Sequence, residues 1–132
     1  MSTPNRLRSP LKRAIGLGSA KYGTQHFVVQ RISAVALFFL VIYVVGLLVS
    51  LVGADYATAR ATVAHPCHAV LLCAFLVAMF WHAQLGLQVV IEDYVHAPGL
   101  ALVVQMLVRF ACVLAALAGL FAIVRIAAGA SA

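Results

Sequence analysis

Residues 32–53 read ISAVALFFLVIYVVGLLVSLVG and contain no charged side chain. A helix needs about 20 apolar residues to cross a hydrocarbon core of roughly 30 Å, so this stretch predicts a transmembrane helix. The whole chain follows the same trend, because 65% of its 132 residues are hydrophobic and 9% are charged. Soluble domains carry roughly a quarter charged residues. The composition therefore predicts a protein embedded in a lipid membrane.

Two later stretches are also long and apolar enough to cross the membrane. One lies within residues 61–91, where Pro66 suits a first helical turn, and the other covers about 100–124. Lipid does not tolerate open sheet edges, and these runs are too apolar for barrel strands, so all three are predicted to be helices. We predict an all-α membrane protein with one three-helix anchor domain, residues 21–132, whose helices cover approximately 29–53, 64–92 and 99–127.

The basic residues predict the orientation of these helices. Six of the nine Lys and Arg residues precede or begin the first helix, and no acidic residue occurs before Asp55. Basic loops stay on the cytoplasmic or matrix side, which predicts an inner N-terminus and an outer C-terminus. Residues 1–20 are predicted to form a mobile basic tail. The net charge of +6 follows from this topology and from contact with anionic headgroups, and does not indicate nucleic-acid binding.

A histidine lies deep within the second apolar stretch. His82 is followed by Gly86 and, eleven residues after the histidine, by Asp93 and Tyr94. At about 100° per residue, eleven steps complete three turns with roughly 20° left over, so His82, Gly86 and Asp93 share a helix face. The rise of about 16 Å places His82 near the middle of the membrane and Asp93 at the headgroups.

These polar residues suit electron-transfer chemistry. An ionisable residue inside a membrane is a functional-site hypothesis by default, and an imidazole at this depth beside Gly86 suits an axial haem ligand. Arg31, Asp93 and Tyr94 at the inner boundary suit haem propionates and a quinone headgroup. The residues alone leave other interpretations open. His82 also suits an interhelical hydrogen bond, Gly86 a tight helix contact, Arg31 a snorkelling anchor and Tyr94 an aromatic belt.

Two motifs make a resemblance to a known family specific. They are His82-x3-Gly86-x6-Asp93-Tyr94 and, upstream of it, Gly23-Thr-Gln-His26-Phe27-x3-Arg31-x-Ser33-Ala34. Together they resemble the small hydrophobic membrane anchor subunit of succinate dehydrogenase. That subunit is the D-type anchor of respiratory complex II, in the cytochrome b family. The likeness covers roughly residues 21–124, and it implies a helical bundle shared with a second anchor subunit.

The resemblance implies a role for each polar residue of the two motifs. His82 would be one of two axial ligands of haem b, with the other ligand supplied by the larger anchor subunit. Arg31 would pair with a haem propionate. Asp93 and Tyr94 would lie at the ubiquinone site, where the tyrosine hydroxyl bonds a quinone carbonyl.

Two further residues are secondary candidates. Some relatives have a His-Asp pair where Gln25-His26 stands, and the histidine there approaches a propionate. His26 is displaced from that position by one residue. Arg109 matches no family role. It is a candidate contact to haem or to another subunit, or a cation that snorkels toward the inner surface, and we favour snorkelling.

The resemblance also implies the function of a larger assembly. Succinate is oxidised at a flavin in a flavoprotein subunit, and electrons pass through an iron–sulfur subunit to ubiquinone at the inner face. This chain would perform no succinate chemistry. It would dock the two peripheral subunits, share haem b with the larger cytochrome b anchor subunit and complete the quinone site. The implied location is a bacterial inner (cytoplasmic) membrane, with the mitochondrial inner membrane as the alternative.

Two other functions stay open on the sequence. His68 lies fourteen residues before His82, on the same face and about 21 Å away, which would suit the stacked haems of a di-haem b-type cytochrome. A cofactor-free three-helix scaffold or pore-forming protein would also explain the hydropathy, with His82 and Asp93 in interhelical hydrogen bonds. The cysteines show no repeated CxxC and predict neither a disulfide framework nor a zinc site; they are Cys67, Cys73 and Cys112.

Overall fold

The computed structural model describes residues 21–129, and the secondary structure there is entirely helical. Its elements are α2 (Lys21–Ser50), α3 (Tyr56–Ala64), α4 (Pro66–Tyr94) and α5 (Pro98–Ala127). The helices α2, α4 and α5 are long and apolar enough to cross a membrane, which confirms the predicted fold class. The predicted mobile tail, residues 1–20, lies outside the described residues.

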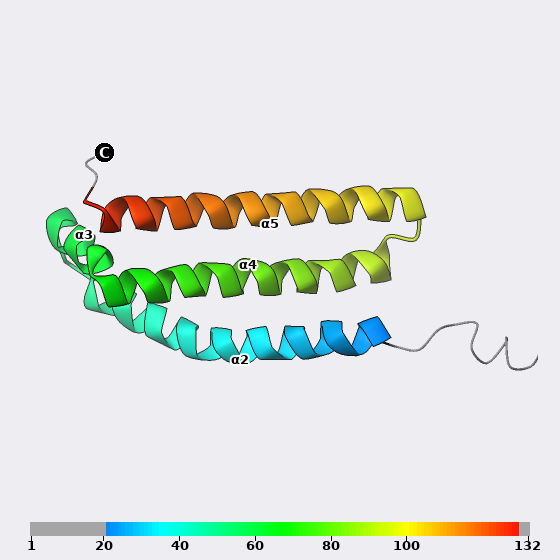
Figure 1. Ribbon diagram of the computed structural model, residues 1–132, viewed down its shortest axis with the longest axis horizontal. Coiled ribbons are helices and arrows are strands. Elements are labelled where there is room, and N and C mark those ends of the chain that lie inside the picture. Colours follow the sequence, from blue (N-terminus) through cyan, green and yellow to red (C-terminus); the bar gives the residue numbers. More distant parts are fainter. Residues whose placement is uncertain (1–20, 130–132) are drawn as a thin grey trace, which may run out of the picture.

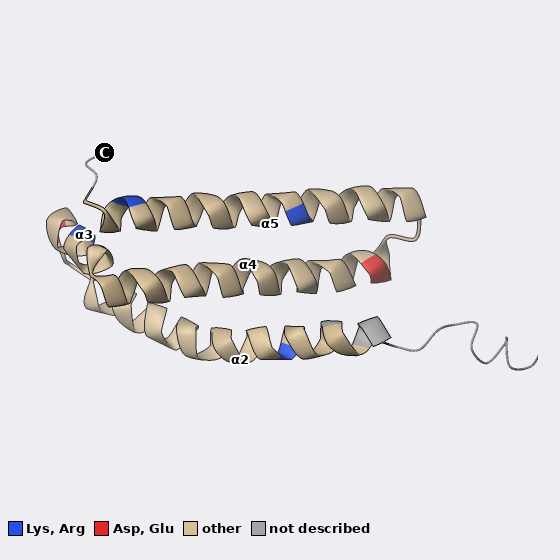
Figure 2. Cartoon of the chain, in the orientation of Figure 1, with Lys and Arg blue, Asp and Glu red and all other residues tan. Residues whose placement is uncertain are grey.

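The three long helices lie side by side in a row, with α4 in the middle (Figure 1). α4 packs against both neighbours, whereas α2 and α5 do not meet within the described part of the chain. Such a row cannot enclose a core, and the buried residues of the described part are Leu47, Ala69, Leu85 and Ile91. Long stretches of all three helices carry no charge (Figure 2). The exposed apolar surface therefore fits contact with lipid or with other membrane helices.

The bounds of α2 differ from the predicted ones at both ends. It begins at Lys21 rather than near residue 29, so the helix extends through the polar residues that precede the apolar run, Gly23 included. It ends at Ser50 rather than near residue 53, because Gly53 has a left-handed φ of 80° in the turn that follows. The bounds of α4 and α5 lie within two residues of the predicted ones.

The short helix α3 occupies a segment that hydropathy assigns to no helix. Its N-cap is Asp55, whose carboxylate accepts a hydrogen bond of 2.9 Å from the backbone N–H of Thr58. Hydrogen bonding from the Thr58 side chain, and then from its N–H, lowers the pKa of Asp55 from its ordinary value. α3 packs against α4 and α5, and Arg60 donates a hydrogen bond of 3.4 Å to the carbonyl of Gly129. This segment therefore links the ends of the two later spans.

A glycine sets how closely α5 approaches α4. A Cβ built at Gly119 would come 2.6 Å from Cδ1 of Leu76, which is closer than real atoms pack. We expect Gly119→Val to displace the Leu76 side chain from its place against α5 and to lower the unfolding temperature of the detergent-solubilised protein, because overpacking costs about 1–3 kcal/mol. Leu76→Ala in the same chain should recover part of the loss by making room.

The matched control for this prediction is Gly46→Val, since nothing lies within 4 Å of a Cβ built at Gly46 in α2. That variant should unfold close to the wild-type temperature. Equal unfolding temperatures for Gly119→Val and Gly46→Val would contradict the close packing of α4 on α5.

Candidate functional site

His82 lies on the face of α4 that packs against α2. Its Nδ1 is 2.9 Å from Oγ of Ser33, and the same Oγ lies 2.9 Å from the backbone carbonyl oxygen of Gln30. The imidazole is half-buried, and no described residue forms a hydrogen bond with its Nε2. Because α4 is unbroken from Pro66 to Tyr94, His82 and Asp93 do share a face of one helix.

The seam between α2 and α4 contains an unsatisfied polar atom near His82. The side-chain oxygen of Gln30 is buried and has no hydrogen-bond partner among the described residues. The Gln30 amide nitrogen lies 3.8 Å from where a Cβ at Gly86 would be, an ordinary contact distance. Gly86 is therefore not required for the packing of α2 on α4. Within the described residues, this seam therefore leaves one buried acceptor unsatisfied.

Asp93 and Tyr94 form the end of α4. Both side chains are exposed, Tyr94 to 79%, and neither forms a hydrogen bond or ion pair within the described part. The neighbouring Glu92 is engaged instead, because its carboxylate accepts hydrogen bonds of 2.9 Å from Gln88 and 3.4 Å from Gln105 of α5. Asp93 and Tyr94 are thus polar groups at this end that no described residue engages.

The structure does not bring Arg31 next to His82. The Arg31 guanidinium is exposed and lies over the ring of Phe27, 5.0 Å from its centroid. Two residues correspond to about 200° around a helix, so Arg31 lies nearly opposite Ser33, which faces His82. A group that pairs with Arg31 would approach from outside the chain. His26 belongs to α2, but its side chain is outside the described residues.

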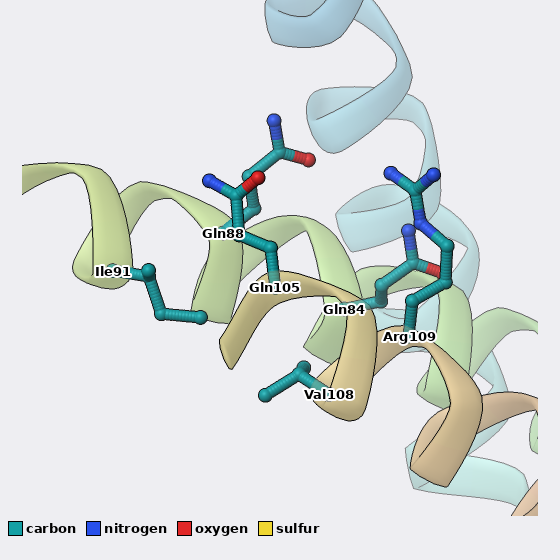
Figure 3. A pocket seen from close by; sticks show the side chains of 6 residues that line it. All are labelled: Gln84, Gln88, Ile91, Gln105, Val108 and Arg109. Carbon is teal, nitrogen blue, oxygen red and sulfur yellow. The ribbon is translucent and has the colours of Figure 1, made fainter. Parts of the chain in front are cut away.

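A second polar cluster lies between α4 and α5. Figure 3 shows the side chain of Arg109 beside Gln84, with the amides of Gln88 and Gln105 near each other; all four line one pocket. Gln84 lies about 200° around α4 from His82, so this pocket is on the other side of the helix. Arg109 therefore does not face the seam that holds His82. The sequence interpretation had no role for the three glutamines, although Gln84, Gln88 and Glu92 recur every four residues.

His68 has a hydrogen-bond partner within the chain. Its Nδ1 is hydrogen-bonded to the hydroxyl of Tyr43 in α2, and the two rings stack with centroids 6.1 Å apart. The ring of His65 lies beside it, at 5.4 Å between centroids. This arrangement is the one expected of a histidine that joins two membrane helices by a polar contact.

These features define a multi-pass membrane protein with a histidine within its middle span and exposed polar groups at the end of that span. The family described as succinate dehydrogenase/fumarate reductase transmembrane subunit matches residues 5–123. The chain is also 31% identical to the succinate dehydrogenase hydrophobic membrane anchor subunit of Rickettsia bellii (strain RML369-C). That likeness covers 88 residues, which are 67% of this chain and 70% of the relative. The chain therefore belongs to the family of succinate dehydrogenase/fumarate reductase transmembrane subunits, which confirms the predicted resemblance.

Proposed function

We propose that this chain is the small membrane anchor of a succinate:ubiquinone oxidoreductase. It docks the flavoprotein and iron–sulfur subunits, shares haem b with a larger anchor subunit and completes the ubiquinone site. One observation carries the proposal beyond family membership. A single unbroken helix, α4, presents the imidazole of His82 and, about 16 Å further along the same face, the unpaired carboxylate of Asp93 with Tyr94 beside it.

The residues around His82 fit a haem. One ring nitrogen of His82 is held by Ser33, while no described residue bonds the other, which leaves that nitrogen available to iron. In this proposal His82 would supply one ligand to haem b, and the larger anchor subunit would supply the other. Haem b would supply reversible one-electron transfer when bound. Arg31 faces away from α4 and would pair with a propionate presented at the subunit interface.

The end of α4 fits a quinone headgroup. Tyr94 would donate a hydrogen bond from its hydroxyl to a quinone carbonyl and stabilise the negative charge that develops on reduction. Asp93 would hold or relay the proton that the reduced oxygen requires. Both groups lie at headgroup level, where water can resupply protons. The exposure of Tyr94 supports a pocket that is completed by other subunits.

The proposed arrangement places the N-terminus and the α4–α5 connection on the inner side of the membrane, where the peripheral subunits dock. The bacterial inner membrane is the proposed location, and the mitochondrial inner membrane is the alternative. Succinate is oxidised in the flavoprotein, so this chain contributes to catalysis at the quinone alone.

Purification of the assembly through a tag on this chain tests the proposal. We expect the flavoprotein, the iron–sulfur subunit and a larger anchor to be identified by mass spectrometry. A reduced-minus-oxidised visible spectrum of the same sample should show a b-type haem. Purification without an iron–sulfur partner would refute the anchor function. A complete four-subunit assembly without haem absorbance would refute only the haem.

A further inference from the structure

We propose that Ser33 is a positioning residue that holds His82 in one tautomer, with the proton on Nδ1, and so keeps Nε2 as the nitrogen that binds iron. The inference rests on the proposed function, because it concerns the residue that would hold the haem. It adds a second residue of α2, besides Arg31, to the proposed haem site.

The Ser33 hydroxyl has a single proton, and two polar atoms lie within hydrogen-bond distance of it. Oγ of Ser33 lies 2.9 Å from the carbonyl oxygen of Gln30 and 2.9 Å from Nδ1 of His82. A serine hydroxyl has one proton to donate, and a carbonyl oxygen can only accept. If the hydroxyl donates to Gln30, then Nδ1–H of His82 can donate to Oγ, and both contacts are hydrogen bonds.

The opposite arrangement loses one of these bonds. If Ser33 donated to Nδ1, its oxygen would face the Gln30 carbonyl oxygen at 2.9 Å without a proton between them. In a membrane interior no bulk water replaces the missing hydrogen bond, so the cost is not recovered. The relay from His82 to Ser33 to the Gln30 carbonyl therefore selects the tautomer with Nδ1 protonated.

This tautomer prepares His82 as a ligand. The lone pair stays on Nε2, which no described residue bonds. A metal-binding histidine typically donates its other ring N–H to an oxygen, and that bond fixes the ring and makes the ligand nitrogen more basic. Here Ser33, 49 positions away in the chain, accepts the hydrogen bond from Nδ1–H of His82. A more basic ligand favours oxidised iron, so removal of the Ser33 hydroxyl should raise the haem midpoint potential.

The test compares variants of the fully assembled complex. Ser33→Ala should raise the midpoint potential of haem b and change its low-spin electron paramagnetic resonance signal, which reports the axial imidazole. Ser33→Thr keeps the hydroxyl and should restore both toward wild type. If Ser33→Ala does not assemble, Ser33→Cys keeps the size with a weaker acceptor and should shift the potential in the same direction.

Ser50→Ala is the matched control. Ser50 is also in α2 and also donates to the carbonyl three residues earlier, Leu47, at 2.7 Å, but it touches no histidine. It should leave both haem signals unchanged. An unshifted Ser33→Ala, or an equal shift in Ser50→Ala, would overturn the role of Ser33. If His82→Ala alters the haem while Ser33→Ala does not, the haem function stands and this inference fails. An assembly without haem b refutes both.

Discussion

Tyr94→Phe should lower ubiquinone reduction by the assembled complex roughly a hundredfold, because it removes the hydrogen bond that Tyr94 is proposed to donate to charge developing in the transition state. The substitution deletes one oxygen and keeps the aromatic ring. Tyr94 is 79% exposed at the end of α4 and bonds no described residue, so folding and membrane insertion should be nearly unaffected. Succinate oxidation with an artificial acceptor that takes electrons upstream of the quinone should continue at the wild-type rate.

The chain provides a matched control for this result. Tyr56 is 75% exposed at the opposite end of the helices, as the first residue of α3. Tyr56→Phe should leave both activities unchanged in the same assay. If the complete complex with Tyr94→Phe reduces ubiquinone as fast as the complex with Tyr56→Phe, then Tyr94 is an interfacial aromatic with no part in quinone chemistry.

The spans could be predicted from sequence because lipid imposes a simple length and composition requirement. The uncharged run of residues 32–53 marks the first span, although hydropathy fixes neither of its ends. The helix extends into polar sequence as far as Lys21, and it ends before the left-handed Gly53. The helix α3 escaped prediction for a related reason. Its signal is a local cap, Asp55 with Thr58, which a search for apolar runs does not detect.

The candidate site was predictable only where it lies on one helix. The His82-to-Asp93 interval follows from helix periodicity alone, and the unbroken α4 supports it. Contacts between helices do not follow from periodicity, because they depend on how one helix is rotated against the next. Sequence therefore could not show that Ser33 meets His82 or that Arg31 turns away. The pairing of Tyr43 with His68 was hidden in the same way.

Two different sets of polar groups lie on opposite faces of α4. His82 and Asp93 lie on one side of the helix, and the pocket with Gln84 and Arg109 lies on the other. A charged residue inside a membrane helix usually faces protein or a polar cavity, and Arg109 follows that rule by lying beside the glutamines. The sequence interpretation of Arg109 as a cation that snorkels did not anticipate this neighbour.

His82→Ala should have the largest effect on the cofactor. Removing the imidazole deletes the nitrogen that would bind haem in the proposed function, so haem b occupancy should fall or the haem should lose its low-spin spectrum. The complex itself should still assemble where the larger anchor retains its own ligand. Reduced-minus-oxidised spectra and a redox titration of the purified assembly measure both effects.

His68→Ala separates this prediction from a di-haem arrangement. His68 is the other histidine on this face of α4, and its Nδ1 is already engaged by Tyr43, so it serves as the matched control. With one haem held by His82, His68→Ala should keep the full haem absorbance and the wild-type midpoint potential, since it removes only a polar contact between α2 and α4. If His68→Ala and His82→Ala each lost half of the haem absorbance, the chain would instead hold two haems stacked along α4. Wild-type spectra and potential in His82→Ala would show that the imidazole is no ligand and that its bond to Ser33 serves helix packing alone.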